Sequence, residues 1–313
     1  MKKHFFYILF ILAIPLSGLA QQQPLYTQTN FNNFGINPAF AGTGECTDIR
    51  LGYRHQWAGF EGNPTTALIN GNGKINRKRG SRKTSFFGVG GRIYNDRAGP
   101  YNFIQMELAG AYHVKLGENL YGSVGVFAGI IQSRFDASGL TLTNFNDPAI
   151  NGSAANIIYP SITPGILIYN KTFYLGFSMQ NIVNIDIPEV GLETRTARHY
   201  IFKGAYSFKV SDRSELVPSI IMRYAYSSTM AYDVNLIYKL DKKYQFGLAY
   251  RNETAIAALV NIKIFNMFSI GYSFDYVINN LNLGTYGSHE IMVGFNTCDL
   301  GEGESKVRCA AFN

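Results

Sequence analysis

The sequence predicts an all-β protein, a transmembrane antiparallel β-barrel of about 14 strands, and three observations support this fold class. Apolar and polar residues alternate with a period of two in segment after segment between residues 47 and 296. The 313-residue chain is 14% aromatic and only 16% charged, whereas ordinary soluble domains carry about 25% charged residues. The connections between the predicted strands are mostly short at one end of the sheet and longer at the other, as in outer-membrane barrels.

The first 20 residues have the features of a secretory signal peptide. Lys2 and Lys3 precede an apolar run, residues 5–14, and small residues lead up to Ala20. This run is too short for a membrane anchor, which needs about 20 residues, so we expect cleavage after Ala20. No later apolar stretch is long enough for a transmembrane helix. The expected parts are the signal peptide 1–20, an irregular N-terminal segment 21–46, the transmembrane barrel 47–296 and a short periplasmic tail 297–313.

Residues 48–54 illustrate the alternation, because apolar and aromatic side chains there alternate with charged residues and a glycine. Such a segment forms a strand with one apolar and one mixed face. Most of the segments have at least the roughly 9 to 11 residues that a tilted strand needs to cross a bilayer. The predicted strands are 47–57, 64–75, 84–95, 102–116, 119–134, 157–169, 172–185, 198–210, 214–226, 228–240, 243–252, 254–265, 266–278 and 287–296.

The connections between these strands differ in length at the two ends of the sheet. Most even-numbered connections are short, such as 117–118 and 170–171. The longest odd-numbered connections are 135–156, 186–197, 279–286 and 58–63. Barrels of outer membranes have short periplasmic turns and longer extracellular loops, which assigns the odd-numbered connections to the cell exterior. Tight odd connections near Ser227 and Glu253 and a long even connection, 76–83, depart from this rule and leave the count open by about two strands.

A soluble β-sandwich or lipocalin-like barrel is the alternative for an alternating chain. Here the faces opposite the aromatic side chains carry many charged residues, which need water or ion pairing. A sheet with one face in lipid and the other around a polar interior meets both requirements, so we favour a membrane barrel. These charged residues are Arg50, Arg54, Arg92, Glu107, Lys115, Lys203, Arg223, Asp233, Arg251, Asp275 and Glu290.

The sequence presents no catalytic or cofactor-binding arrangement. The histidines lack the spacing of a zinc site, no GxSxG motif occurs, and the glycines of residues 88–91 lie within a predicted strand rather than before a helix. His289 and Glu290 are adjacent, but alternation places them on opposite faces. The net charge of +7 is spread over many segments of an exported chain, which argues against nucleic-acid binding. We therefore expect no enzymatic activity, no cofactor and no metal.

The three cysteines are Cys46, Cys298 and Cys309, and an oxidising periplasm permits a disulfide between two of them. Cys46 immediately precedes the first predicted strand, and Cys298 closely follows the last. Closure of the barrel places these two strands side by side, so a bridge between Cys46 and Cys298 is expected to link them at the periplasmic rim. The local pair Cys298 and Cys309 is the alternative.

Basic residues gather in the connection 76–83, which the even-numbered position assigns to the periplasm. A polybasic turn at a membrane surface is expected to lie among phospholipid headgroups. Docking of an acidic periplasmic partner is the alternative for this turn. The basic residues are Arg77, Lys78, Arg79, Arg82 and Lys83.

The beginning of the expected mature chain resembles a known family. It opens with residues 21–28, Gln-Gln-Gln-Pro-Leu-Tyr-Thr-Gln, and the segments 53–57, Tyr-Arg-His-Gln-Trp, and 64–66, Pro-Thr-Thr, follow later. Between them stands the most specific motif, Asn37, Pro38, Ala39, Phe40, Ala41 and Gly42. These features are similar to the PorP/SprF family of outer-membrane proteins. The motifs span about residues 21–66, and length and patterning extend the resemblance over essentially the whole expected mature chain.

The resemblance implies an outer-membrane component of the type IX secretion system of Bacteroidota, with no catalytic residues to assign. It also implies a role in the secretion and surface attachment of cargo with a C-terminal sorting domain, including large gliding adhesins. The partners it implies are outer-membrane lipid, the C-terminal domain of the cargo, and the periplasmic ring and translocon subunits. We expect the loops 135–156 and 186–197 to capture the secreted domain.

Residues 21–45 need a separate interpretation, because their asparagines, glycine and proline favour turns over a strand. One hypothesis is that they fold into the lumen or across its periplasmic mouth as a plug. In this hypothesis Pro38 fixes a bend, and Phe31, Phe34 and Phe40 are apolar anchors. The alternative is a disordered tether, since chain termini are poorly ordered unless they are held down.

The leading functional expectation is an interaction barrel that holds a secreted protein and catalyses no reaction. A channel or transporter for hydrophobic or small solutes is the main alternative, because a barrel of this width can enclose a pathway. An outer-membrane hydrolase is a third class, but it would need a reactive serine or a carboxylate pair that the sequence does not present.

Overall fold

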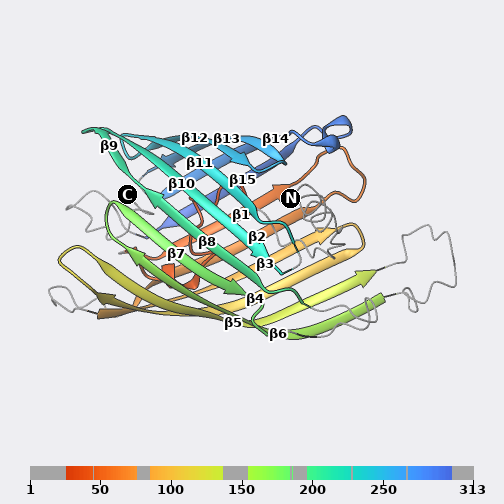
Figure 1. Ribbon diagram of the computed structural model, residues 1–313, viewed down its shortest axis with the longest axis horizontal. Helices are drawn as coiled ribbons and strands as arrows, with labels where there is room; N and C mark the ends of the chain where they lie inside the picture. Colours follow the sequence, from red (N-terminus) through yellow and green to blue (C-terminus); the bar gives the residue numbers. More distant parts are fainter. Residues whose placement is uncertain are drawn as a thin grey trace, which may run out of the picture.

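A closed antiparallel sheet makes up almost all of the computed structural model (Figure 1). The structure describes residues 26–44, 46–75, 85–136, 154–183, 185, 196–226, 228–265 and 267–297. The strands are β1 (Asp48–His55), β2 (Thr65–Ile75), β3 (Ser85–Ala98), β4 (Tyr101–Lys115), β5 (Tyr121–Asp136), β6 (Ala154–Tyr169), β7 (Phe173–Gln180), β8 (His199–Tyr206), β9 (Phe208–Ser211), β10 (Ser214–Ala225), β11 (Ala231–Leu240), β12 (Tyr244–Arg251), β13 (Ala255–Ile264), β14 (Phe268–Val277) and β15 (Ser288–Asn296).

The predicted barrel of 14 antiparallel strands is confirmed, because β8 and β9 act as one strand that is interrupted at Ser207. Both pieces pair with the same neighbour, β10. At the interruption the Ser207 N–H donates to the Thr172 carbonyl at 2.7 Å, and its hydroxyl donates to Glu215 at 2.7 Å. The register with β10 is the same on both sides of the interruption, from Ser219↔Ala205 to Leu216↔Phe208. The sequence pattern did not indicate this break.

The sheet closes where the last strand meets the first. β15 pairs with β1 in antiparallel register from Asp48↔Asn296 to His55↔His289. Every other strand pairs with its neighbours along the chain, including β10 with β11. Closure leaves no free first or last strand, which is the requirement for a sheet that crosses lipid.

The two faces of each strand have the two environments that the alternation predicts. In β11, Val234, Leu236 and Tyr238 point outwards and are exposed, while Asp233 and Asn235 point inwards and are buried. Side chains of successive residues in a strand point to opposite faces. The exposed apolar face is therefore the lipid-facing surface of the barrel, and the polar face surrounds the lumen.

One predicted strand boundary is wrong by several residues. The segment 172–185 was expected to be one strand, but β7 ends at Gln180. Asn181 adopts a left-handed backbone conformation with φ 55°, which ends the extended run. The apolar residues that follow, Ile182 and Val183, continue the sequence pattern but not the strand.

Helical structure is limited to single short turns in the described part of the chain. They include the 3₁₀ turns η1 (Pro38–Phe40) and η3 (Asn280–Leu283). Across the described ranges, no helix has the length and apolar character to cross a membrane.

Candidate functional site

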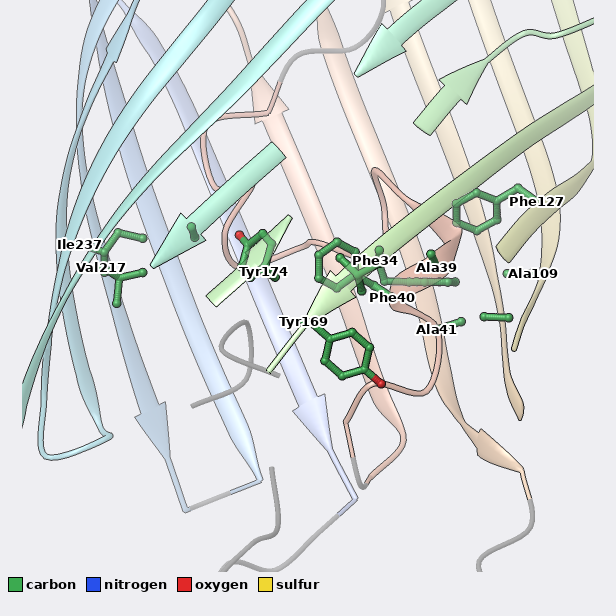
Figure 2. Packing of buried hydrophobic residues seen from close by; sticks show 13 residues of the cluster. Phe34, Ala39, Phe40, Ala41, Ala109, Phe127, Tyr169, Tyr174, Val217 and Ile237 are labelled. Carbon is green, nitrogen blue, oxygen red and sulfur yellow. The ribbon is translucent and has the colours of Figure 1, made fainter. Parts of the chain in front are cut away.

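Residues 26–44, which we call the lumenal segment, lie inside the barrel. Phe34, Ala39 and Phe40 pack between Phe127 on one side and Tyr174 on the other (Figure 2). Phe34 and Phe40 are at most 2% exposed. The aromatic rings of the segment therefore take the place that a core would have in a soluble protein.

The motif of residues 37–42 forms one tight turn and its exit. Asn37 is the N-cap of η1, and its side-chain Oδ1 accepts from the Ala39 N–H at 2.9 Å. Pro38 occupies the first position of the turn, where a missing N–H costs nothing. Gly42 leaves the turn with φ 76°, a conformation that favours glycine. Each of these residue types is thus favoured by the local backbone.

Carbonyl groups of the turn accept hydrogen bonds from side chains of the wall. The Ser123 hydroxyl donates to the Ala39 carbonyl at 2.9 Å. The His113 Nε2 lies 2.7 Å from the Ala41 carbonyl, and its Nδ1 lies 2.9 Å from the Tyr169 hydroxyl. A buried carbonyl without a partner would be costly, so these contacts hold the turn against β4 and β5.

Asn37 also joins two strands of the wall. Its side-chain Nδ2 donates to the Ile166 carbonyl of β6 at 3.0 Å and to the Phe177 carbonyl of β7 at 3.1 Å. The carbonyl oxygens of Ile166 and Phe177 belong to strands that pair with each other. One amide from the lumenal segment therefore bridges a seam of the barrel from the inside.

Glycines of the wall provide the space into which the lumenal segment fits. A Cβ at Gly88 would overlap the Ala41 carbonyl, and one at Gly165 would overlap the Asn37 side chain. A Cβ at Gly125 would lie 2.7 Å from the Ala39 nitrogen, and one at Gly90 would lie 2.5 Å from Phe34. Strand glycines commonly mark such close approaches. In this barrel the approaching backbone is the chain's own N-terminal part.

A row of buried ion pairs lies beside the start of the lumenal segment. Arg54 contacts Asp275 at 2.7 Å and Glu290 at 3.1 Å. Arg251 contacts Asp275 at 3.3 Å and Asp233 at 3.4 Å. The row ends at Arg223, which lies 2.9 Å from Asp233. Three cations and three anions alternate along it, so the formal charges balance.

Thr27 of the lumenal segment completes this row. Its hydroxyl lies 2.8 and 2.7 Å from the two carboxylate oxygens of Asp275, and its N–H donates to Glu290 at 2.8 Å. The Gln28 N–H donates to the other oxygen of Glu290 at 3.1 Å. Buried carboxylates are tolerated only when they are paired and hydrogen-bonded. The segment therefore supplies part of the solvation of these two acids.

Tyr26, the first described residue, stacks on Tyr94 with ring centroids 5.7 Å apart. Burial raises the pKa of the Tyr26 phenol well above its ordinary value, and the neighbouring Tyr94, Asp96 and Glu290 act in the same direction. The phenol thus stays neutral at any physiological pH.

Two further cations of the wall bind backbone carbonyls of the segment. Arg92 pairs with Glu107 at 2.5 Å and also donates to the Gly35 carbonyl at 2.5 Å. The Lys203 ammonium donates to the Thr29 carbonyl at 2.7 Å and to the Asn33 side chain at 2.6 Å. The contacts of the lumenal segment thus extend around the wall from β3 to β8.

The structure brings together some of the residues that the sequence indicated and leaves others untested. The motif residues Asn37 to Gly42 form the turn at the centre of the lumen. Cys46 is in a disulfide, and both candidate partners, Cys298 and Cys309, lie outside the described residues. The basic residues Arg77, Lys78, Arg79, Arg82 and Lys83 also lie outside the described residues. Their docking role stays a prediction.

Sequence reasoning placed most of the inward charges correctly but did not connect them. Alternation assigns Arg54, Asp275 and Glu290 to the mixed face. Their contacts join β1, β14 and β15, which are distant in the chain but adjacent after closure. The role of Thr27 had no local signal, because it depends on the path of the lumenal segment. Lys115 lies two residues after the inward-facing His113 and pairs with Tyr121, as expected for the mixed face, but it is exposed because it ends β4.

Solved structures similar to this one are membrane barrels with low sequence identity. A FadL homologue from Pseudomonas aeruginosa has 10% identity and a TM-score of 0.49, covering 88% of this chain and 95% of its own. The monoaromatic hydrocarbon channel CymD has 9% identity and a TM-score of 0.49, covering 89% and 94%. The porin NanC has 9% identity and a TM-score of 0.39, covering 80% and 98%. No curated protein matches the sequence.

The family comparison is decisive for the classification. The family described as type IX secretion system membrane protein PorP/SprF matches residues 18–295. This range contains the lumenal segment and nearly all of the barrel wall, so the match covers the features described above. The chain therefore belongs to the PorP/SprF family of type IX secretion system membrane proteins.

Proposed function

We propose that this protein is an outer-membrane component of the type IX secretion machinery that attaches secreted cargo at the cell surface and does not conduct solutes. The observation that carries the proposal is the lumenal segment, which occupies the barrel and is bonded to its wall on several sides. A barrel whose interior is filled can bind other molecules at its surface, but its lumen is not free to conduct solutes. Membership of the PorP/SprF family supports the proposal that the protein acts in the type IX secretion machinery.

The energetics of the interior support a filled lumen. Each hydrogen bond between the segment and the wall contributes about 0.5–1.5 kcal/mol net, and bonds to charged groups contribute about 1.5–3 kcal/mol. Removing the segment would leave Asp275 and Glu290 without the donors of Thr27 and Gln28. It would also leave empty the space that the wall glycines provide for the segment. The wall is therefore adapted to this occupant rather than to passing solutes.

The end of the barrel that carries the longer connections offers a surface for a protein partner. There the connections 56–64 and 278–287 are joined by backbone hydrogen bonds, Ala58 N to the Gly287 carbonyl and Tyr286 N to the Ala58 carbonyl, both at 2.8 Å. This pair of loops displays Leu283, 97% exposed, and Tyr286, 82% exposed. Aromatic and apolar side chains on a fixed loop are typical of interaction surfaces. We infer that cargo binds at this end, through its C-terminal domain.

The proposed cargo is a secreted adhesin with a C-terminal sorting domain, and the proposed neighbours are the periplasmic ring and translocon subunits. Pull-down of the tagged full-length protein from detergent-solubilised outer membranes tests this. We expect a secreted protein to be recovered through its C-terminal domain, and a deletion strain to release that protein into the medium. Normal surface display in the deletion strain would contradict the proposal.

A double variant, Leu283→Ser with Tyr286→Ser, tests in the same pull-down whether this pair of loops binds the cargo. These side chains point into solvent, so barrel folding should be unchanged. Recovery of the cargo should fall if the loop pair is the binding surface. Unchanged recovery would assign cargo binding to another part of the barrel.

A further inference from the structure

The barrel wall is least completely paired between β6 and β7. On one side, β6 pairs with β5 along its whole length, Ala154–Tyr169. On the other side, only the stretch Gly165–Tyr169 pairs with β7. The part of β6 before Gly165 has one backbone hydrogen bond on its β7 side within the described ranges. It runs from the Ile182 N–H to the Ile162 carbonyl at 3.3 Å.

Two prolines stand on this incompletely paired edge of β6. The Ile162 carbonyl points towards the β7 side, and backbone polar groups alternate in direction along a strand. Pro160 and Pro164 therefore lie at positions whose N–H groups would point the same way, but proline has none. An unpaired N–H is costly in lipid. The prolines lower the number of unsatisfied donors when this edge has no partner.

The chain leaves the wall after β7 instead of continuing beside β6. Asn181 turns the backbone with φ 55°. Ile185 then packs against Ile131 and Tyr159, whose side chains are buried on the inward face of β5 and β6. Ile185 is therefore folded inwards instead of lying in the wall beside the first half of β6.

Asn37 acts at this same seam. Its Nδ2 donates to the carbonyls of Ile166 and Phe177, one on each side of the β6–β7 boundary. Gly165 and Gly176, on the two strands, provide the room for the asparagine side chain. We propose that the β6–β7 seam is the place where the barrel wall opens sideways towards the lipid, and that Asn37 is the positioning residue that latches it closed.

The latch couples the lumenal segment to the wall. Withdrawal of the motif removes both hydrogen bonds of Asn37, so movement of the segment and separation of β6 from β7 favour each other. Outward-facing Ile158, Ile162 and Ile166 line the β6 side, so the opening faces hydrocarbon. Addition of a strand from another protein is disfavoured at this edge, because prolines blunt strand edges.

Hydrogen exchange of the full-length protein in lipid nanodiscs tests the proposal. In the unmodified protein, amides of β6 and β7 at residues 165–168 and 175–178 should exchange at least about tenfold faster than those of β11 and β12 at residues 235–238 and 246–249, since open seams exchange locally. Equal protection of the two seams would overturn the proposal without any variant.

Variants distinguish the two roles of Asn37, its hydrogen bonds across the seam and its capping of the turn η1. In the Asn37→Ser variant, the serine can still cap the turn, but its side chain is too short to reach the carbonyls of both Ile166 and Phe177. Hydrogen exchange in β6 and β7 should therefore rise about fivefold or more, as expected for the loss of one or two hydrogen bonds. Asn70→Ser is the control, because it removes another amide contact between wall and segment, Asn70 to Asn32 at 3.0 Å, and should leave this seam unchanged. An unchanged seam in Asn37→Ser, or equal acceleration in all strands, would refute the latch.

Discussion

Arg54 shows at the scale of a single residue how the closed barrel creates its interior. The side chain is 1% exposed and holds two carboxylates, Asp275 and Glu290, which come from the other end of the chain. A buried charge is stable only while its partners remain. The ion pairs of the lumen therefore depend on β1, β14 and β15 being neighbours.

Replacing Arg54 by methionine keeps the side-chain volume but removes the charge. We expect a loss of about 3–5 kcal/mol in the free energy of unfolding, because Asp275 and Glu290 lose the buried Arg54 guanidinium and only Arg251 remains at Asp275. Urea unfolding in lipid vesicles, followed by the fluorescence of the single tryptophan, Trp57, measures this loss. The control is Arg213→Ala, which removes an exposed ion pair with Asp241 at the rim. Equal unfolding curves for the two variants would contradict the buried network.

Gly88 tests the fit between the wall and the lumenal segment. Gly88→Ala should displace the segment, because the new Cβ would overlap the Ala41 backbone. Gly110→Ala is the matched control, since a Cβ there has nothing within 4 Å. Limited proteolysis of the purified barrels should cleave residues 26–44 much faster in the first variant only. Identical protection in both variants would show that the segment does not pack against β3.

At the scale of elements, the strands could be predicted from the sequence because their pattern has a local cause. A strand in lipid must alternate, so Val234, Asn235 and Leu236 reveal their faces without knowledge of the fold. Breaks in the strands have no such signal. At the interruption, Ser207 contacts Thr172 and Glu215, which become its neighbours only in the folded sheet.

The position of the lumenal segment also depends on tertiary contacts. Its composition predicts turns, but Thr27, Asn33 and Asn37 bond Glu290, Tyr174 and Phe177, which lie 263, 141 and 140 residues away in the sequence. Local sequence patterns do not predict contacts between residues that are so far apart in the chain. Glycines of β3 and β5 lie where the segment comes closest to the wall, but the sequence does not identify the approaching segment.

The ends of the barrel wall allow a prediction for the disulfide of Cys46. Thr47 and Thr297 exchange hydrogen bonds, from the Thr297 N–H to the Thr47 carbonyl at 3.0 Å and from the Thr47 N–H to the Thr297 hydroxyl at 3.2 Å. Cys46 and Cys298 are the next residues in the chain. We expect Cys298→Ser to abolish the disulfide and Cys309→Ser to retain it. Thiol labelling of the denatured, unreduced protein distinguishes the two, and the opposite result would assign the bridge to Cys309.

The whole molecule combines a wall that faces lipid with an interior that its own N-terminal part occupies. Apart from the incompletely paired edge of β6, the closed sheet satisfies the backbone within the membrane, and the lumenal segment satisfies the inward carboxylates and fills the space above the wall glycines. In this account the protein works as a closed scaffold within the secretion machinery. In the proposed function, the lumenal segment prevents solutes from passing while it occupies the barrel.

Conductance of the purified full-length protein in planar lipid bilayers tests this account most directly. The filled lumen predicts currents close to the bilayer baseline over the usual voltage range, with brief openings at most. The Gly88→Ala variant, in which the segment is displaced, should show larger and longer openings than Gly110→Ala. A large, steady conductance of the unmodified protein would contradict the account.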